Sequence, residues 1–215
     1  MDPNRKRRRF SAALLGTVLA PWLVPAAANG NAAGKKTILV VGDSLSAEYG
    51  LERGTGWVTA LADQVRDGHP EYQIYNSSIS GDTTSGGLSR LPALLKEQTP
   101  DVVIIELGGN DALRGLSLDM TRRNLAAMID ASQQAGAQVL LVGMQIPPNY
   151  GKRYTEEFSA LFAELARDKQ VALVPFLLEG IATNQSYFQD DGIHPNESAQ
   201  PLLAQNVWPH LQPLL

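Results

Sequence analysis

The sequence predicts an α/β protein, a three-layer α/β/α sandwich with a five-stranded parallel sheet. Short apolar runs typical of strands alternate with segments whose apolar residues recur at helical spacing. The helical segments are roughly 10 to 15 residues long, a length that connects parallel strands through right-handed crossovers. Residues 102–107 are nearly all apolar, as expected of a strand covered on both faces. With 215 residues, 44% hydrophobic and 19% charged, the chain can form one globular domain with a substantial core.

The first half of this domain predicts three strands and two helices. The strands are predicted at 37–41, 72–76 and 102–107. Between the first two strands, apolar residues from Trp57 to Val65 recur at helical spacing, and Gly68 ends this pattern. Residues 83–98 predict the second helix. Within it, Pro92 lacks a backbone N–H and must either kink the helix or start a new one.

The second half of the domain predicts three more helices and two more strands, with helices at 121–135, 155–169 and 196–208 and strands at 139–142 and 171–174. Gly136 follows the first of these helices, in a position where glycine commonly ends a helix. Phe158, Leu161 and Leu165 recur at the spacing of one helix face. The alternation of strands and helices therefore continues to the end of the chain.

The first residues of the chain have the order of a secretory signal peptide. Basic residues at 5–9 are followed by an apolar run at 10–24 and by small residues at 26–28, where a signal peptidase would cut. The apolar run has about 15 residues, whereas a membrane span needs roughly 20, so a cleaved signal is favoured over an uncleaved anchor. We predict a signal peptide at 1–28, a connector at 29–36 and a single domain at 37–215.

Charge and composition exclude several classes of function. Without residues 1–28, which hold five of the 18 basic and one of the 22 acidic residues, the chain has a net charge of -8. Nucleic acids and anionic membrane surfaces attract basic patches, so neither is an expected partner. The absence of cysteine removes thiol nucleophiles, thiolate zinc sites and disulfides. We expect a bacterial periplasmic or secreted monomer without stable membrane insertion after signal removal.

Four short segments place polar residues or glycine where a ligand would bind. In a parallel α/β sheet, ligands bind beyond the carboxyl ends of the strands. The segments at this edge are Gly42-Asp43-Ser44, the loop that contains Gly81, residues 108–111, and the Asp191 to His194 loop before the last helix. Alone, Ser44 could cap a helix and Asn110 could form a turn. Their joint position at one edge favours a functional site.

Together these segments hold the parts of an acyl-transfer site. Ser44 is the predicted nucleophile, and His194 is the only histidine placed to act as its base and later as an acid. Asp191 would orient the imidazole and stabilise it when charged. The predicted oxyanion hole consists of the backbone N–H groups of Ser44 and Gly81 and the side-chain amide of Asn110.

Two other functions would use the same edge differently. The carboxylates at this edge could converge on Mg²⁺ and form a metal-dependent phosphoesterase, with Asp43, Asp82, Asp111 and Asp191 as ligands. The chain could also be a non-enzymatic exported protein whose cleft binds a lipid or a carbohydrate. The serine hydrolase interpretation is favoured because its parts occur together, each at a strand end.

The ordered motifs resemble those of the SGNH (GDSL) hydrolase superfamily from about Thr37 to Leu215. The matching residues of that pattern are Ser44, Gly81, Asn110 and His194. Segments 88–95, 105–111 and 147–151 look like the bacterial periplasmic thioesterase, lysophospholipase and arylesterase branch. The resemblance implies a flavodoxin-like fold and a metal-independent, cofactor-free serine esterase or thioesterase acting on small acyl esters or thioesters. A carbohydrate O-acetyl esterase of the same superfamily is the closest alternative.

Further residues are predicted to contact the substrate or support the site. The candidates for substrate binding are Asp43, Leu45, Asp111, Ile146, Pro147, Tyr150 and Ile193. Two of them, Ile146 and Tyr150, are available to line an acyl groove. Glu106 lies in an otherwise apolar strand, where a carboxylate needs a partner or a raised pKa. We predict a buried ion pair between Glu106 and Arg90 or Arg114.

Overall fold

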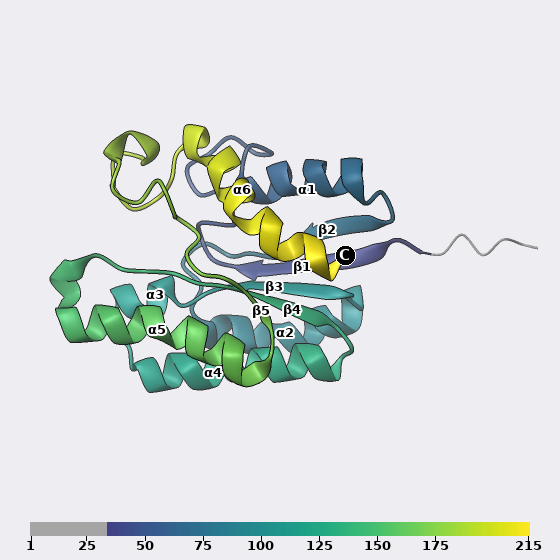
Figure 1. Cartoon of the computed structure of the whole chain (residues 1–215), viewed down its shortest axis with the longest axis horizontal. Coiled ribbons are helices and arrows are strands. Elements are labelled where there is room, and N and C mark those ends of the chain that lie inside the picture. Colours follow the sequence, from purple (N-terminus) through teal and green to yellow (C-terminus); the bar gives the residue numbers. More distant parts are fainter. Residues whose placement is uncertain (1–33) are drawn as a thin grey trace, which may run out of the picture. The chain divides into compact units, whose positions relative to one another are not determined.

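The computed structural model describes residues 34–215, and a five-stranded parallel sheet lies at the centre of this part (Figure 1). The strands lie in the order β2-β1-β3-β4-β5. Their bounds are β1 Lys36–Gly42, β2 Tyr72–Asn76, β3 Val102–Glu106, β4 Gln138–Val142 and β5 Ala172–Val174. The predicted α/β fold with its parallel sheet is confirmed. The predicted signal peptide and most of the connector lie outside the described residues.

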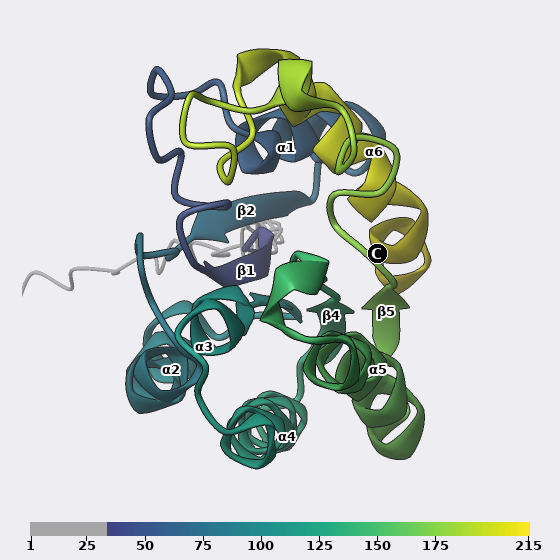
Figure 2. The same ribbon diagram turned by 90° about the vertical axis from the view of Figure 1, so that its left-hand side faces the viewer.

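Helices cover both faces of the sheet. Their bounds are α1 Trp57–Gly68, α2 Thr84–Gln98, α3 Gly109–Leu113, α4 Leu118–Gln134, α5 Lys152–Lys169 and α6 Gln200–Leu211. Figures 1 and 2 show α1 and α6 on one face, and α2, α4 and α5 on the other, which makes the three predicted layers. Within residues 34–215, no helix combines the length and the apolar character needed to cross a membrane.

The core lies on both sides of the two central strands. Residues 38–41 of β1 and 102–105 of β3 are all 0% exposed. Trp57 of α1 is also completely buried, while Phe158 and Phe162 of α5 meet edge to face with ring centroids 5.2 Å apart. A close-packed core of this kind resists deformation, so the sheet is a rigid support for the loops at its carboxyl edge.

The structure decides between the two alternatives at Pro92. The α2 helix runs through this residue from Thr84 to Gln98, so a second helix does not start there. Pro92 is exposed, and the carbonyl group of Leu88, which loses its usual N–H donor, can be hydrated on the same side. A proline inside this helix is therefore tolerated.

After β3 the chain forms a short helix where the sequence predicts a flexible turn. Gly108 has a φ of 118°, a conformation that favours glycine. The chain reverses at this point, and α3 begins at Gly109. Asn110 and Asp111 thus lie in the first turn of a helix, and Asp111 points into the interior with 0% exposure.

Gly143, which follows β4, has no room for a side chain. Its N–H donates to the Val174 carbonyl at 2.7 Å, and its carbonyl accepts from the Leu177 N–H at 3.0 Å. A Cβ atom at this position would lie 2.3 Å from the backbone oxygen of Pro175.

We expect Gly143→Ala to lower the free energy of unfolding by about 1 to 3 kcal/mol, measured by urea denaturation. Gly68→Ala is the control, because its Cβ meets nothing within 4 Å; equal stability of the two variants would contradict the prediction.

Candidate active site

Ser44, His194 and Asp191 form a continuous hydrogen-bonded line at the carboxyl edge of the sheet. Ser44 lies in the turn that follows β1, and His194 lies in the loop that precedes α6. The Nε2 atom of His194 is 2.9 Å from Ser44 Oγ, and its Nδ1 atom is 2.6 Å from Asp191 Oδ2. A hydroxyl, an imidazole and a carboxylate in this order are the arrangement that activates a serine nucleophile.

Asp191 is held in place by the backbone of its own loop. Its Oδ1 atom accepts hydrogen bonds from the N–H groups of Ile193 and His194 at 2.8 and 3.0 Å. Partial burial raises the pKa of Asp191, but these bonds and the His194 side chain outweigh this effect and lower the pKa to about 2. The carboxylate is therefore ionised at neutral pH and can stabilise a positively charged imidazole.

A contact that the sequence did not reveal joins the Ser44 loop to the His194 loop. The side chain of Gln189 donates to the Tyr49 carbonyl at 2.9 Å, and its backbone N–H donates to the His194 carbonyl at 2.8 Å. The Tyr49 ring lies against the His194 imidazole, with centroids 4.4 Å apart. A Cβ atom on Gly50 would lie 2.1 Å from the Gln189 amide oxygen. Gln189 and Tyr49 belong to no periodic pattern or motif, so no sequence signal identified them.

The two other predicted oxyanion donors are connected to each other. Gly81 has a φ of 79°, which favours glycine, and its carbonyl accepts from Arg114 Nη2 at 3.0 Å. The same nitrogen lies 3.5 Å from Asn110 Oδ1. The Asn110 amide nitrogen donates to Asp43 Oδ2 at 3.0 Å. An amide nitrogen carries two hydrogens, so Asn110 retains one that the bond to Asp43 does not use.

A buried carboxylate lies directly beneath the Ser44 turn. Glu106, the last residue of β3, is 2% exposed, and its Oε2 atom accepts from Ser46 Oγ at 2.7 Å and from the Asp43 N–H at 3.3 Å. The Cα of Gly42 lies against the same group, since a Cβ there would be 2.8 Å from Glu106 Oε2. The same Cβ would lie 2.7 Å from Ser46 Oγ, so the close approach of Ser46 and Glu106 together favours glycine at position 42.

The predicted ion pair of Glu106 with an arginine is wrong. Arg90 instead donates to Asp82 at 2.8 Å and also contacts backbone carbonyls, including that of Gly42 at 3.3 Å. Arg114 is occupied at Gly81. The space around Glu106 is filled by the Ser44 turn, which supplies a hydroxyl and an N–H in place of a guanidinium.

Glu106 and Asp43 are two buried carboxyl groups, and the charge of Asp43 acts on Glu106. Burial, and then the charge of Asp43, raise the pKa of Glu106 well above its ordinary value. Burial also raises the pKa of Asp43 to about 6. Asp43 accepts from the Leu45 N–H and the Asn110 amide, which favour its ionised form. Glu106 also accepts two hydrogen bonds, but the negative charge of Asp43 opposes its ionisation, so we infer that the proton of the pair lies on Glu106.

The residues predicted to bind substrate fall into two groups. Asp43 and Asp111 are 2% and 0% exposed, so the prediction that their side chains contact a substrate is not supported. Asp111 accepts from the N–H and the hydroxyl of Thr84, at 2.9 and 2.5 Å, and holds the start of α2. The others are Leu45 and Ile146, which pack against the core, and the exposed Pro147, Tyr150 and Ile193.

The four carboxylates of the metal-dependent alternative do not converge. They have separate partners: Asp43 with Asn110, Asp82 with Arg90, Asp111 with Thr84 and Asp191 with His194. In the part of the chain that the structure describes, no group of three or more His, Cys, Asp or Glu side chains is arranged to hold a metal ion. The described residues therefore provide no ligand set for the Mg²⁺ site of this alternative.

Protein stability should depend on pH through Glu106. Folding raises the pKa of Glu106. The contribution of this carboxyl group to the free energy of unfolding is therefore fully present below its ordinary pKa of 4.5 and is lost as pH rises toward its pKa in the folded protein. Glu106→Gln cannot ionise and should avoid this loss. The Tm of Glu106→Gln relative to wild type should therefore increase between about pH 5 and about pH 8.

The control for this measurement is Glu97→Gln. Glu97 is exposed on α2, and its side chain has no hydrogen bond or ion pair with residues 34–215, so its Tm difference should stay constant. A constant difference for Glu106→Gln as well would contradict the assignment of a raised pKa.

Comparison with known proteins agrees with this geometry. The model of the GDSL-like Lipase/Acylhydrolase family matches residues 40–200. The chain is 52% identical over 183 residues to Esterase TesA of Pseudomonas aeruginosa, which covers 85% of this chain and 91% of that protein. It is 44% identical over 184 residues to Thioesterase 1/protease 1/lysophospholipase L1 of Escherichia coli, covering 86% and 87% of the two chains.

A solved structure extends the similarity to the fold. The psychrotrophic esterase EstA from Pseudoalteromonas sp., in a structure inhibited by monoethylphosphonate, matches with a TM-score of 0.79 and 40% identity. The match covers 83% of this chain and 98% of that one. Because the family model spans most of the sequence and the relatives match over nearly their full length, the chain belongs to the GDSL-like lipase/acylhydrolase family.

Proposed function

We propose that this chain is a serine hydrolase that cleaves carboxyl esters and acyl thioesters. The observation that carries the proposal is the pair of contacts from His194, at 2.9 Å to Ser44 and at 2.6 Å to Asp191. Relatives named as an esterase and as a thioesterase and lysophospholipase support this substrate class. Phosphonates react with activated serines, so the inhibited esterase structure supports a serine nucleophile.

In the first half of the reaction, Ser44 Oγ attacks the acyl carbonyl carbon while His194 Nε2 accepts the serine proton. Asp191 holds the other imidazole nitrogen and stabilises the charge that the ring acquires. The carbonyl oxygen becomes an oxyanion, stabilised by the N–H groups of Ser44 and Gly81 and by the Asn110 amide. Asp43 acts through Asn110, because it fixes the direction of that amide.

In the second half, the tetrahedral intermediate collapses and the bond to the alcohol or thiol breaks. His194 donates its proton to this leaving group, and an acyl-serine remains. Water then attacks the acyl carbon while His194 accepts a proton from it, and the carboxylic acid leaves as Ser44 regains its proton. The cycle consumes one water and requires only groups of this site.

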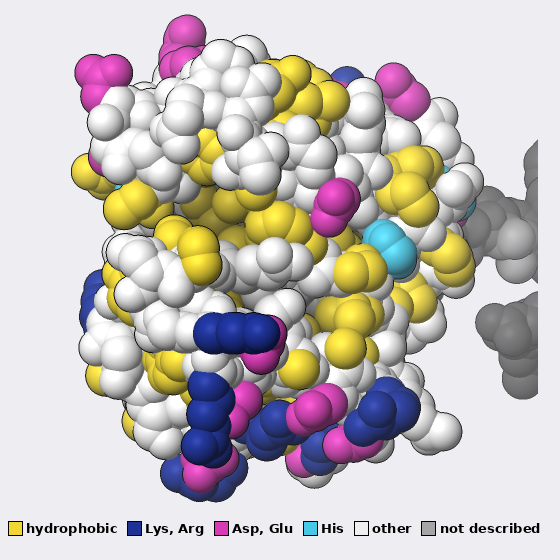
Figure 3. All heavy atoms as spheres, turned by 60° about the vertical axis from the view of Figure 1, so that its left-hand side comes forward, with side chains coloured by type: hydrophobic (Ala, Val, Ile, Leu, Met, Phe, Trp, Pro, Cys, Tyr) yellow, Lys and Arg dark blue, Asp and Glu magenta, His cyan; other side chains and the backbone are white. Residues whose placement is uncertain are grey.

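The surface near the site suits an apolar acyl group. Figure 3, which brings the carboxyl ends of the strands forward, shows hydrophobic side chains in and around a hollow. Tyr150, in the loop between β4 and α5, and Ile193, beside His194, are 39% and 50% exposed. Ile146 in the same loop as Tyr150 is nearly buried at 9%. These residues are the proposed rim of the acyl site.

We further propose that the protein acts outside the cytoplasm as a monomer. The basic, apolar and small-residue order of positions 1–28 supports a cleaved signal peptide and a periplasmic or secreted location. The catalytic domain would then be residues 37–215.

A fluorophosphonate probe tests the nucleophile directly. It should label the wild-type chain at Ser44 and leave Ser44→Ala unlabelled, because only an activated hydroxyl reacts. Ser85→Ala, on the exposed face of α2, is the control and should label like wild type. Peptide mapping by mass spectrometry reads out the site, and labelling of Ser44→Ala would reject the assignment.

Removing the Asn110 amide tests the oxyanion hole. Asn110→Ala should lose on the order of 100-fold to 1000-fold in kcat with p-nitrophenyl esters, since the donor acts on charge that develops in the transition state. The KM should change much less. A loss confined to KM would instead indicate a role in substrate binding.

A further inference from the structure

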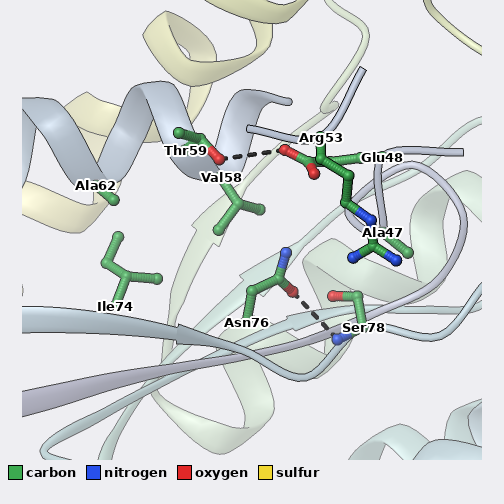
Figure 4. A pocket seen from close by; sticks show the side chains of 9 residues that line it. All are labelled: Ala47, Glu48, Arg53, Val58, Thr59, Ala62, Ile74, Asn76 and Ser78. Atoms are coloured by element: carbon green, nitrogen blue, oxygen red, sulfur yellow. Dashed lines mark hydrogen bonds between the residues drawn. The ribbon is translucent and has the colours of Figure 1, made fainter. Parts of the chain in front are cut away.

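A second pocket lies on the α1 side of β2, close to the Ser44 turn. It has a volume of about 310 Å³ and is lined by Ala47, Glu48, Arg53, Val58, Thr59, Ala62, Ile74, Asn76 and Ser78. Figure 4 shows that these side chains come from the segment after Ser44, from α1 and from the end of β2. None of the proposed catalytic residues lines it.

The hydrogen-bond acceptors of this pocket are already occupied. The Glu48 carboxylate accepts from the N–H groups of Gly54 and Gly56, at distances of 2.9 to 3.1 Å, and from the Thr59 hydroxyl at 3.2 Å. Partial burial raises the pKa of Glu48, but these bonds and the nearby charge of Arg53 hold it below its ordinary value. The Asn76 amide oxygen accepts from the Ser78 N–H at 3.1 Å.

Two donors of the pocket, in contrast, are unoccupied. The Arg53 guanidinium makes no ion pair or hydrogen bond with any residue between 34 and 215, and Figure 4 shows it directed into the pocket. The Ser78 hydroxyl oxygen is buried and has no hydrogen-bond partner in the described chain. A buried hydroxyl without a partner is unfavourable. The pocket therefore offers two donors to a ligand that brings acceptors.

The remaining surface of the pocket is apolar. Val58 and Ala62 of α1 and Ile74 of β2 form one side, opposite Arg53 in Figure 4. A ligand that fits this surface has an anionic head next to Arg53 and a compact apolar body. The planar guanidinium suits the two oxygens of a carboxylate or a phosphate.

The pocket is within reach of the proposed nucleophile. Ala47, on its wall, is three residues past Ser44, and the Ala47 N–H donates to the Asp43 carbonyl at 2.9 Å in a helical turn. Residues three apart in such a turn are roughly 5–6 Å apart. On the other wall, the Asn76 amide donates to the Ser46 carbonyl at 2.8 Å. The wall of the pocket and the Ser44 turn are therefore parts of one short segment.

We propose that this pocket binds an anionic group on the leaving side of the substrate. The inference rests on the proposed hydrolase function, and it assigns phosphorylated or carboxylated alcohols and thiols as favoured leaving groups. Arg53 and the Ser78 hydroxyl bind the anionic oxygens, while His194 protonates the departing oxygen or sulfur. The acyl chain lies outside this pocket.

Binding is tested first without turnover. Phenyl phosphate should bind to the Ser44→Ala chain, and its Kd, measured by calorimetry, should rise about 10-fold or more when Arg53→Gln is added, as expected for a lost charge-assisted bond. Ser78→Ala should also weaken binding without lowering Tm, since its hydroxyl has no partner to lose.

The control is Arg66→Gln. Arg66 is an exposed arginine of α1 paired with Asp63, and its replacement should leave Kd unchanged. Equal effects of Arg53→Gln and Arg66→Gln, or no binding to the Ser44→Ala chain, would overturn the proposal.

Turnover then tests whether the pocket serves the leaving group. Two esters share a butyryl group and differ in the leaving phenol, one neutral (phenyl butyrate) and one carrying a phosphate (4-butyryloxyphenyl phosphate). Arg53→Gln should lower the ratio of kcat/KM for the anionic over the neutral ester by about 10-fold. An unchanged ratio would overturn the proposal even if phenyl phosphate binds. Full activity of Ser44→Ala would overturn the serine mechanism instead, and the binding measurement is independent of that result.

Discussion

The hydrogen bonds from the Ser44 turn to the buried Glu106 carboxyl group are the constraint on which this site depends. One oxygen of Glu106 accepts hydrogen bonds from the Ser46 hydroxyl and from the Asp43 N–H. These two bonds fix the chain on either side of Ser44. The same turn also places Asp43 where it orients the Asn110 amide. The proposed nucleophile and the proposed oxyanion donor therefore share one buried support.

A neutral acid suits this position better than an ion pair. A guanidinium beside Glu106 would introduce a second buried charge, whose desolvation is costly unless all its donors find acceptors. A protonated Glu106 needs fewer partners and leaves Asp43 as the charged member of the pair. The arrangement makes the support sensitive to ionisation, since a second negative charge beneath the turn would repel Asp43. The buried Glu106 thus holds the Ser44 turn in place but lowers the free energy of unfolding at high pH.

The sequence was sufficient to place the proposed reacting groups at one edge of the sheet, but it did not identify the residues that support them. Because parallel strands end at one edge, Ser44 and Asn110 could be brought together from the strand pattern alone, and His194 followed from its loop position. The partner of Glu106 could not be inferred, since it depends on how the Ser46 side chain packs against Gly42. Asp111 was predicted to contact a substrate, and its burial could not be inferred because it depends on the short helix that turns its side chain inward. The contact between Gln189 and Tyr49 depends on two loops that are distant in sequence and follow no pattern.

The segment after β1 connects two surfaces that would otherwise be separate. Ser44 faces His194, while Ala47 and Arg53, a few residues later, face the pocket beside β2. Glu48 joins the two, because its carboxylate ties the segment to Gly54 and Gly56 at the start of α1. The ligand proposed for Arg53 would contact the same segment that presents Ser44. If a leaving group occupies the pocket, this short stretch of backbone holds it at a fixed position relative to Ser44, which favours orientation of the substrate as well as affinity.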